Sequence, residues 1–217
     1  MKNLLIKELR LSTIPLAYIF LTFALMTFIP GYPILCGAFF FCLGIFQSYQ
    51  SSREANDILY SVLLPVSKRD VVKGKYLTAA ILQMVMFALC AICTIIRMVF
   101  MSDTDVYETN ALMAANLVYL AFVLLIFAAF NIIFIGGFFK TAYGVGKPFI
   151  LFIIVNFVII AIAEALHHLP GLAWLDTLDF SHAGRQVTVL AAAAIIYAAA
   201  TIISCQISQN RFKKIDL

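Results

Sequence analysis

Charged residues are scarce in this sequence, and their scarcity excludes an ordinary soluble protein. Only 12% of the 217 residues are charged and 64% are hydrophobic, whereas soluble domains are about 25% charged and about 45–50% apolar. The apolar residues form blocks long enough to cross a bilayer, which takes about 20 helical residues per crossing. Because the blocks are continuously apolar rather than alternating, they favour helices over a β-barrel. The sequence therefore predicts an all-α polytopic membrane protein.

The sequence also lacks the motifs of nucleotide, metal and catalytic sites. The stretch GVGK at 144–147 is not a phosphate loop, because Thr141 stands where the first glycine is required and Pro148 where the hydroxyl residue is required. The stretch EALHH at 164–168 lacks the His-Glu-x-x-His pattern of zinc proteases. The five cysteines do not form a four-ligand zinc pattern. We expect no catalytic residue, no metal and no cofactor in this chain.

Six transmembrane helices are predicted within a single transmembrane domain, 1–217. They are separated by polar or Pro/Gly-containing segments, and the predicted spans are about 13–29, 33–50, 76–100, 111–139, 148–166 and 187–206. The first span shows no small-residue cleavage site, so we expect it to be retained rather than removed as a signal peptide. Residues 1–12 before it are either a weakly amphipathic helix at the inner surface or a simple charged lead-in.

Basic residues are unevenly divided between the two sides of this topology. With a cytoplasmic N-terminus, thirteen of the fifteen Lys and Arg residues lie inside, and only Arg97 and Arg185 lie outside. Six of the eleven acids lie outside. This pattern follows the positive-inside rule and predicts that both termini are cytoplasmic. The cations then anchor the chain near anionic headgroups, so the net charge of +4 requires no nucleic-acid partner.

The cytoplasmic segment 51–75 contains two predicted helix starts. Ser51 with Glu54, and Ser67 with Asp70, have the spacing of a capping box. The first helix, at about 52–63, should end before Pro65, because proline lacks an N–H group and disfavours helical dihedrals in the preceding residue. The second helix should start at about residue 68 and continue into the third span.

The first of these short helices carries an apolar stripe: Ile58, Leu59, Val62 and Leu63. An apolar stripe on a cytoplasmic segment needs a covering surface. It either packs against the inner ends of the chain's own spans or docks into a groove on a separate cytoplasmic protein. Both can hold together if different residues are used for each contact.

Several polar residues fall inside the predicted spans, where burial in lipid is costly. These residues are Gln83, Arg97, Asn131, Asn156 and Glu164. Asn and Gln side chains commonly join helices by hydrogen bonds, and lining a substrate path is the alternative. Arg97 and Glu164 can pair at similar depth, or each can extend to the outer surface.

Residues 53–77, REANDILYSVLLPVSKRDVVKGKYL, resemble the stretch that follows the second span in ABC-2 type transporter permeases. In that family an acidic residue, a leucine-rich helix, Pro-Val-Ser-Arg/Lys, a hydrophobic pair and Lys-Tyr/Phe-Leu recur. The sequence departs at EAND, where many relatives carry Gly-Thr or Gly-Trp after the acid. The predicted topology and the length also agree with the family, and the small size is similar to permease subunits of bacterial peptide exporters.

The resemblance implies a permease subunit of an ATP-driven ABC exporter in the bacterial plasma membrane, with a hydrophobic or amphipathic substrate, most simply a peptide. A separate ATP-binding subunit, which carries ATP and Mg, would grip the helix at about 52–63, called the coupling helix in this family. A second permease chain, identical or paralogous, would complete the transporter. The coupling positions implied are Glu54, Asp57, Ile58, Leu59, Val62 and Leu63.

The same resemblance implies roles for the residues that follow the coupling helix. The residues that would set the angle between this helix and the third span are Pro65, Ser67 and Asp70. The cations that would hold the inner surface are Lys68, Arg69, Lys73 and Lys75.

Two other functions share the same composition. A membrane receptor or immunity protein would only sequester its ligand, and a membrane-embedded enzyme would need clustered Asp, His or Ser residues near an interface. ATP hydrolysis that responds to the chain would separate a transporter from both.

Overall fold

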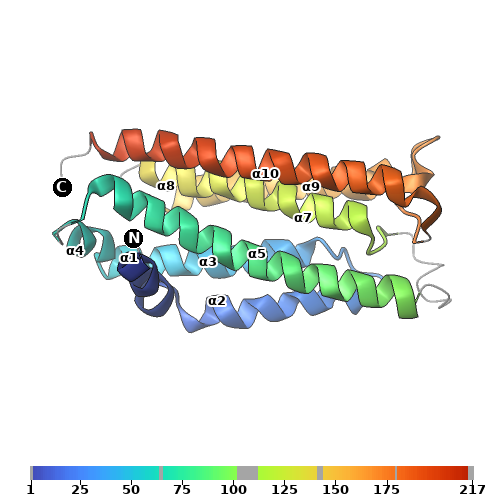
Figure 1. The fold of residues 1–217 in the computed structure, drawn as a ribbon, viewed down its shortest axis with the longest axis horizontal. Coiled ribbons are helices and arrows are strands. Elements are labelled where there is room, and N and C mark those ends of the chain that lie inside the picture. The colour runs from blue at the N-terminus through green and yellow to red at the C-terminus, as the bar shows by residue number, and fades with distance from the viewer. Residues whose placement is uncertain (1, 64–65, 102–111, 141–143, 179, 215–217) are drawn as a thin grey trace.

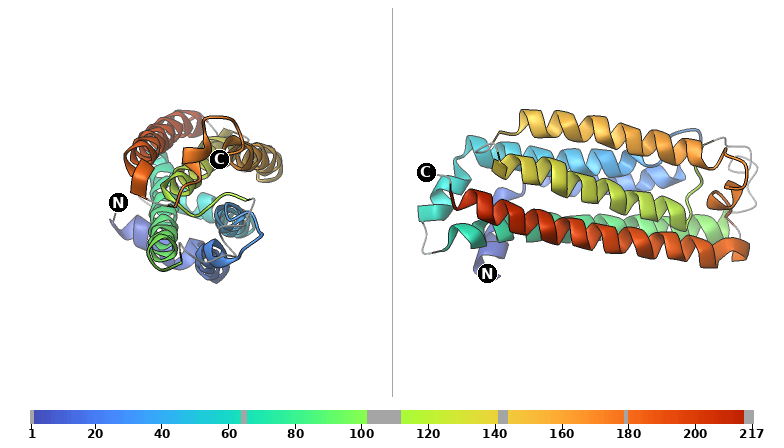
Figure 2. Two further views of the ribbon diagram at one scale, coloured as in Figure 1. Left: turned by 90° about the vertical axis from the view of Figure 1, so that its right-hand side faces the viewer. Right: turned by 90° about the horizontal axis from the view of Figure 1, so that it is seen from above.

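The protein is an elongated bundle of helices that lie side by side. The computed structural model describes residues 2–63, 66–101, 112–140, 144–178 and 180–214, and every regular element in these ranges is helical (Figures 1 and 2). The described chain begins and ends at the same end of the bundle, which also carries the short helix α4 (Figure 1). We call this end the chain-end side. The predicted all-helical fold is confirmed.

Most of the chain is contained in long helices joined by short segments. In chain order the elements are α1 (Lys2–Lys7), the π-helix η1 (Glu8–Ser12), α2 (Pro15–Ile19), the 3-10 helix η2 (Phe20–Phe28), α3 (Cys36–Glu54), α4 (Asp57–Leu63), α5 (Lys68–Phe100), α7 (Leu117–Ala129), the π-helix η3 (Phe130–Ile135), α8 (Gly136–Lys140), α9 (Gly146–Leu166), the 3-10 turns η4 (Ala173–Leu175) and η5 (Phe180–His182), and α10 (Ala183–Phe212).

Four of these helical segments are long and apolar enough to cross a membrane. They are Lys68–Phe100, Leu117–Lys140, Gly146–Leu166 and Ala183–Phe212. A fifth crossing is counted if Lys2–Ser12 and Pro15–Phe28, which meet at 90°, form one broken span. Helix α3 is not among them, because its second half, QSYQSSRE at 47–54, is polar. By length and composition, the described helices thus provide four or five crossings, compared with the six predicted.

The first predicted span begins with a sharp bend. Residues 2–12 are helical, as one of the two interpretations expected, and Pro15 starts α2 at its first turn after an extended Ile14. Proline is favoured there because its missing N–H group would have no helical partner. The continuation, η2, is a 3-10 helix, which rises about 2.0 Å per residue instead of about 1.5 Å. Residues 15–28 therefore cover about 25 Å although they number only fourteen.

The predicted helix start at Ser51 is wrong. Helix α3 continues through this position, and the N–H of Ala55 still donates to the Ser51 carbonyl at 2.9 Å. Asn56 then adopts a positive φ of 51°, a conformation that Asn tolerates and that commonly ends helices. Helix α4 therefore begins at Asp57 rather than at about 52, and Glu54 belongs to the end of α3.

The predicted start of α5 is confirmed. Ser67 is the N-cap, its Oγ accepts from the backbone N–H of Asp70 at 3.1 Å, and it donates to Asp70 Oδ2 at 2.7 Å. From there the helix runs without a break to Phe100. Pro65, which was predicted to separate the two helices, lies outside the described residues.

Two glycines allow α3 to pack closely against the first span. A Cβ atom at Gly37 would lie 2.7 Å from the carbonyl oxygen of Phe23. A Cβ atom at Gly44 would lie 2.9 Å from Phe20 Cδ2 and 3.2 Å from Ala17 Cα. Small residues at such contacts let helix backbones approach, which is the usual basis of helix association in membranes.

We predict that Gly37→Ala destabilises the protein by about 1–3 kcal/mol, because the new methyl group collides with backbone that cannot move alone. Gly184→Ala in α10 is the matched control, since its Cβ would meet no atom within 4 Å. Thermal unfolding in detergent measures both. Equal stabilities of the two variants would contradict the close packing of α3 on η2.

Candidate functional site

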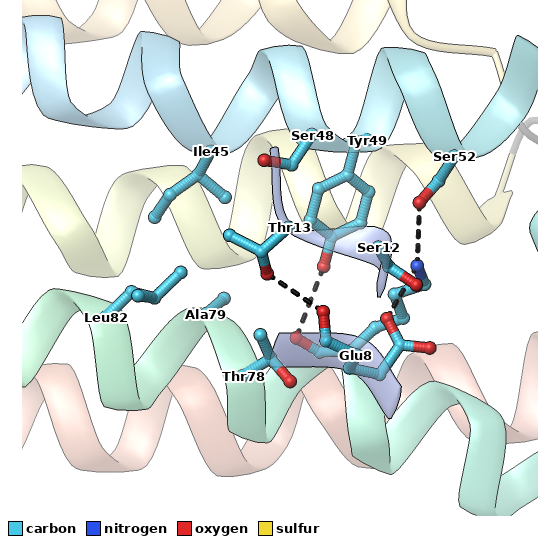
Figure 3. Close-up of a pocket in the computed structure, with 11 residues that line it drawn as sticks. Glu8, Ser12, Thr13, Ile45, Ser48, Tyr49, Ser52, Thr78, Ala79 and Leu82 are labelled. Carbon is cyan, nitrogen blue, oxygen red and sulfur yellow. Dashed lines mark hydrogen bonds and ion pairs between the residues drawn. The ribbon is translucent and has the colours of Figure 1, made fainter. Parts of the chain in front are cut away.

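Four charged side chains from three separate segments meet at the chain-end side. Lys7 and Glu8 come from the N-terminal helix, Asp57 from the start of α4 and Lys75 from the second turn of α5. The two cations and two acids balance in charge. We call these four residues the charge cluster. Figure 3 shows Glu8 and Ser12 facing residues of α3 across this region.

Lys75 is the centre of the charge cluster. Its side chain is only 4% exposed. The Nζ atom lies 2.7 Å from Glu8 Oε2 and 2.9 Å from Asp57 Oδ2, and it donates to Ser52 Oγ at 2.9 Å. An ammonium group has three N–H donors, so each of them has a partner. Lys75 was predicted to hold the inner membrane surface; that prediction is wrong, because the helix turns this residue into the bundle.

Asp57 connects α4 to both neighbouring segments. One carboxylate oxygen pairs with Lys7 Nζ, and the other pairs with Lys75 Nζ and accepts from Ser12 Oγ at 3.1 Å. Lys7 Nζ also donates to Ser61 Oγ at 2.8 Å, one turn further along α4. Burial alone would raise the pKa of Asp57, but Lys75 and Lys7 outweigh it and lower the pKa below its ordinary value.

The cavity beside the charge cluster is small, and both polar and apolar residues line it. Its volume is about 20 Å³, and its lining includes Thr13, Ser48, Tyr49 and Thr78 (Figure 3). A cavity needs a volume of about 10–15 Å³ to hold one water molecule. The cavity is therefore about the size of one water molecule, and the charge cluster joins three segments of the chain.

The two faces of α4 differ. Ile58 is 4% exposed and packs in the core, and Asp57 and Ser61 point into the charge cluster. Leu59, Tyr60 and Leu63 point outward, with exposed fractions of 43%, 66% and 75%. Asp57 and Ile58 were predicted to contact a partner, but their side chains face the interior of this chain.

Of the two remaining predicted coupling residues, one packs partly against the core and the other lies outside α4. Val62 is half-buried, and Glu54 is exposed at the end of α3, where it accepts from Gln50 Nε2 at 3.2 Å. Tyr60 was not predicted. Its spacing from Leu63, i to i+3, places both on one face of a helix and could have identified it.

The basic residues after the Ser67 cap are in different environments. Arg69 and Lys73 are exposed and Lys68 is half-buried, whereas Lys75 is buried. The position of Lys75 could have been found from the helical period, because Val71, Val72 and Ala79 lie on the same buried face. The sequence alone suggested four equivalent cations.

A second polar cluster lies in the middle of the bundle and joins α5, η3 and α10. Gln83 and Asn131 exchange two side-chain hydrogen bonds of 2.9 and 3.0 Å. Asn131 Nδ2 also donates to Thr201 Oγ1, and Tyr197 OH donates to Gln83 Oε1, both at 2.9 Å. Because these amides bond to one another across helices, the helix-joining interpretation of Gln83 and Asn131 is confirmed.

The π-helical turn η3 supplies a backbone acceptor next to this cluster. The carbonyl of Asn131 accepts from Ser204 Oγ at 3.0 Å and from Tyr76 OH at 3.4 Å. Tyr76 OH also shares hydrogen bonds with Ser204 and Ser208, at 2.8 and 3.0 Å. The Asn131 carbonyl also accepts the i to i−5 bond of the π-helix from the backbone N–H of Gly136, so the side chains of α5 and α10 add to a backbone hydrogen bond.

The other polar residues predicted within the membrane have different surroundings. Arg97 donates to the carbonyl of Thr27 at 2.7 Å, and Glu164 accepts from the backbone N–H of Met113 at 2.8 Å. These contacts tie each residue to a different backbone segment, not to the other as one interpretation expected. Asn156 is fully buried in α9, and its side-chain amide has no hydrogen-bond partner within the described parts of the chain.

Comparisons with known proteins indicate the family. A family model described as "ABC-2 family transporter protein" matches residues 2–213. No curated protein and no solved structure matches the chain. The matched region includes the charge cluster, α4 and all the long helices. Over the described residues, no group of three or more His, Cys, Asp or Glu side chains is arranged to hold a metal ion.

We predict that Lys75→Met destabilises the protein by about 3–5 kcal/mol, because buried Glu8 and half-buried Asp57 lose their shared cation. Lys73→Met, an exposed position on the same helix, should change stability little. The double variant Glu8→Gln/Lys75→Met should lose less than the sum of the two single variants. Thermal unfolding of the detergent-solubilised protein measures these differences, and additive losses would contradict the pairing.

The pH dependence of the Asp57 contribution follows from its lowered pKa. The pKa of an Asp side chain in the unfolded protein is about 3.9, and the ion pairs of Asp57 contribute their full stability at pH values above it. This stability is lost as the pH falls through the lower pKa that Asp57 has in the folded protein. The difference in stability between the natural protein and Asp57→Asn should therefore be constant from about pH 8 to 5 and shrink below about pH 4. A difference that already declines between pH 7 and 5 would contradict this assignment.

Proposed function

The chain belongs to the ABC-2 transporter family, and from this we propose that it is the permease subunit of an ATP-driven exporter. Permeases of this family form the transmembrane component, carry no catalytic activity of their own and normally work with an ATP-binding subunit. Export of a hydrophobic or amphipathic substrate, most simply a peptide, is the transport reaction proposed. ATP and Mg belong to the partner subunit in this proposal.

The outward face of α4 is the observation that carries the proposal. Leu59, Tyr60 and Leu63 are exposed on a short helix at the chain-end side, beyond the long helices (Figure 1). Exposed apolar side chains on such a helix fit the groove of a partner protein, because docking removes them from water. We propose that these three residues and Glu54 contact the ATP-binding subunit and that α4 is the coupling helix.

The charge cluster supports a mechanical role for α4. A force applied to α4 is transmitted to α5 through the ion pair between Asp57 and Lys75, and to the N-terminal helix through the ion pair between Asp57 and Lys7. Ion pairs in a buried setting resist separation more strongly than exposed ones. The helix α4 therefore moves together with α5 and the N-terminal helix instead of swinging freely.

The topology proposed for the whole chain has six spans with both termini in the cytoplasm of a bacterial cell. Both ends of the described chain and α4 lie on one side of the bundle, as an even number of crossings requires (Figure 1). In this topology α3 also crosses the membrane, although its C-terminal half is polar, and it brings the number of spans to six. We further propose that two permease chains assemble, because α9 and α10 keep broad apolar faces exposed, and a partner chain or lipid must cover them.

We predict that Leu59→Asp and Leu63→Asp, tested singly, each abolish the co-purification of an ATP-binding subunit with the tagged permease. A charge in a docking face loses the apolar contact and must be desolvated on binding. Leu169→Asp is the control, because Leu169 is similarly exposed and precedes the outer segment on the far side of the bundle.

The purified complex should hydrolyse ATP, and the rate should change when the permease is present. Retained co-purification and unchanged ATP hydrolysis in both Asp variants would overturn the docking face. Binding without any effect of the permease on ATP hydrolysis would favour a ligand-sequestering membrane protein over a transporter.

A further inference from the structure

A groove lies on the outside of the bundle, away from α4 and the charge cluster. It has a volume of about 250 Å³ and lies between α10 and the η3–α8 segment. The residues that define it are Ile132, Gly136, Ala200, Ile203, Ile207 and Arg211. Ile132, Ile203 and Ile207 are each between 43% and 54% exposed. The groove is thus an apolar surface feature with one cation at its end.

The floor of the groove offers no free hydroxyl group. Ser204 and Ser208 also line it, but both are buried and share hydrogen bonds with Tyr76 OH. Gly136 keeps the floor open, because a Cβ atom there would lie 3.0 Å from Ser204 Oγ and fill the space above it. An apolar occupant can therefore enter without separating a buried polar group from its partner.

The length of the groove matches one leaflet of a bilayer. From Ala200 to Arg211 the helix advances eleven residues, or about 16 Å at about 1.5 Å per residue. The hydrocarbon core of a bilayer is about 30 Å thick, so this length is about half of it. Arg211 lies in the last turn of α10, at the chain-end side (Figure 2). An acyl chain that starts at the headgroup level near Arg211 would reach the bilayer centre near Ala200.

The charge around Arg211 favours an anionic headgroup. Arg211 is exposed, as are Lys213 and Lys214, which follow it, and Lys140 at the end of α8. The sequences of α8 and α10 contain no Asp or Glu. A cation at the membrane surface attracts anionic lipids with about 1 kcal/mol for each Lys or Arg.

We propose that this groove binds one acyl chain of an anionic phospholipid, with the phosphate at Arg211. The apolar residues provide contact for the chain over one leaflet, and Arg211 selects the charge of the headgroup. The site is separate from the proposed partner contact on α4. Binding at this position would hold η3, α8 and α10 together from the lipid side, next to the hydrogen bonds of Tyr76.

The test uses the full chain purified in detergent and exchanged into micelles with equal amounts of phosphatidylglycerol and phosphatidylcholine. Native mass spectrometry then counts the lipids that remain bound. Ile203→Trp fills the groove from its exposed side, and Ile202→Trp is its control, since Ile202 is 57% exposed on the same helix but does not line the groove. Arg211→Gln removes the cation, and Arg185→Gln, at an exposed arginine near the other end of α10, is the corresponding control.

The natural protein and both controls should retain phosphatidylglycerol in preference to phosphatidylcholine. Ile203→Trp should lose the retained lipid, and Arg211→Gln should lower the preference about fivefold, the effect of one cation at the surface. Unchanged lipid retention in both groove variants would overturn the proposal. It would also be overturned if Ile203→Trp converted a dimer into a monomer and the protein still retained the lipid. The measurement needs no ATP-binding subunit, so its result is independent of the proposed transport function.

Discussion

The buried ammonium group of Lys75 is the interaction on which the chain-end side of this protein depends. An isolated charge in a protein interior costs several kcal/mol, and Lys75 is stable there only because Glu8, Asp57 and Ser52 surround it. These three partners come from η1, α4 and α3, so one side chain fixes the positions of three segments around α5. The small residues of α3 and the aromatic core pack beside this framework.

The two polar clusters lie at different positions along the length of the bundle. The charge cluster joins segments at the chain-end side, whereas Gln83, Asn131 and Tyr197 join long helices in the middle of the bundle. Between them, Tyr76 lies one residue from Lys75 and bonds to Ser204 and Ser208 of α10. Helix α5 thus contributes to both polar clusters, with Lys75 in one and Gln83 in the other.

The sequence predicted those features that depend on local or periodic signals. The Ser67 cap could be identified because Ser67 and Asp70 are only three residues apart, and the all-helical fold followed from continuous apolar blocks. The predicted helix start at Ser51 is wrong because this capping pattern, although equally good, lies within α3, which packing extends to Glu54. The pairing of Lys75 with Glu8 could not be predicted, since no local pattern relates residues 67 positions apart in the chain. The helical period could only have shown that Lys75 faces inward.

The distance along the chain between the partners in the charge cluster also sets an order for biosynthesis. Lys7 and Asp57 are separated by 50 residues, and Lys75 is made later than both. At about 5–20 residues per second, translation takes several seconds to proceed from Glu8 to Lys75. During that time the N-terminal helix has no buried cation to receive Glu8. The final attachment of the N-terminal helix therefore waits for the start of α5, although the N-terminal helix is the first part of the protein to be made.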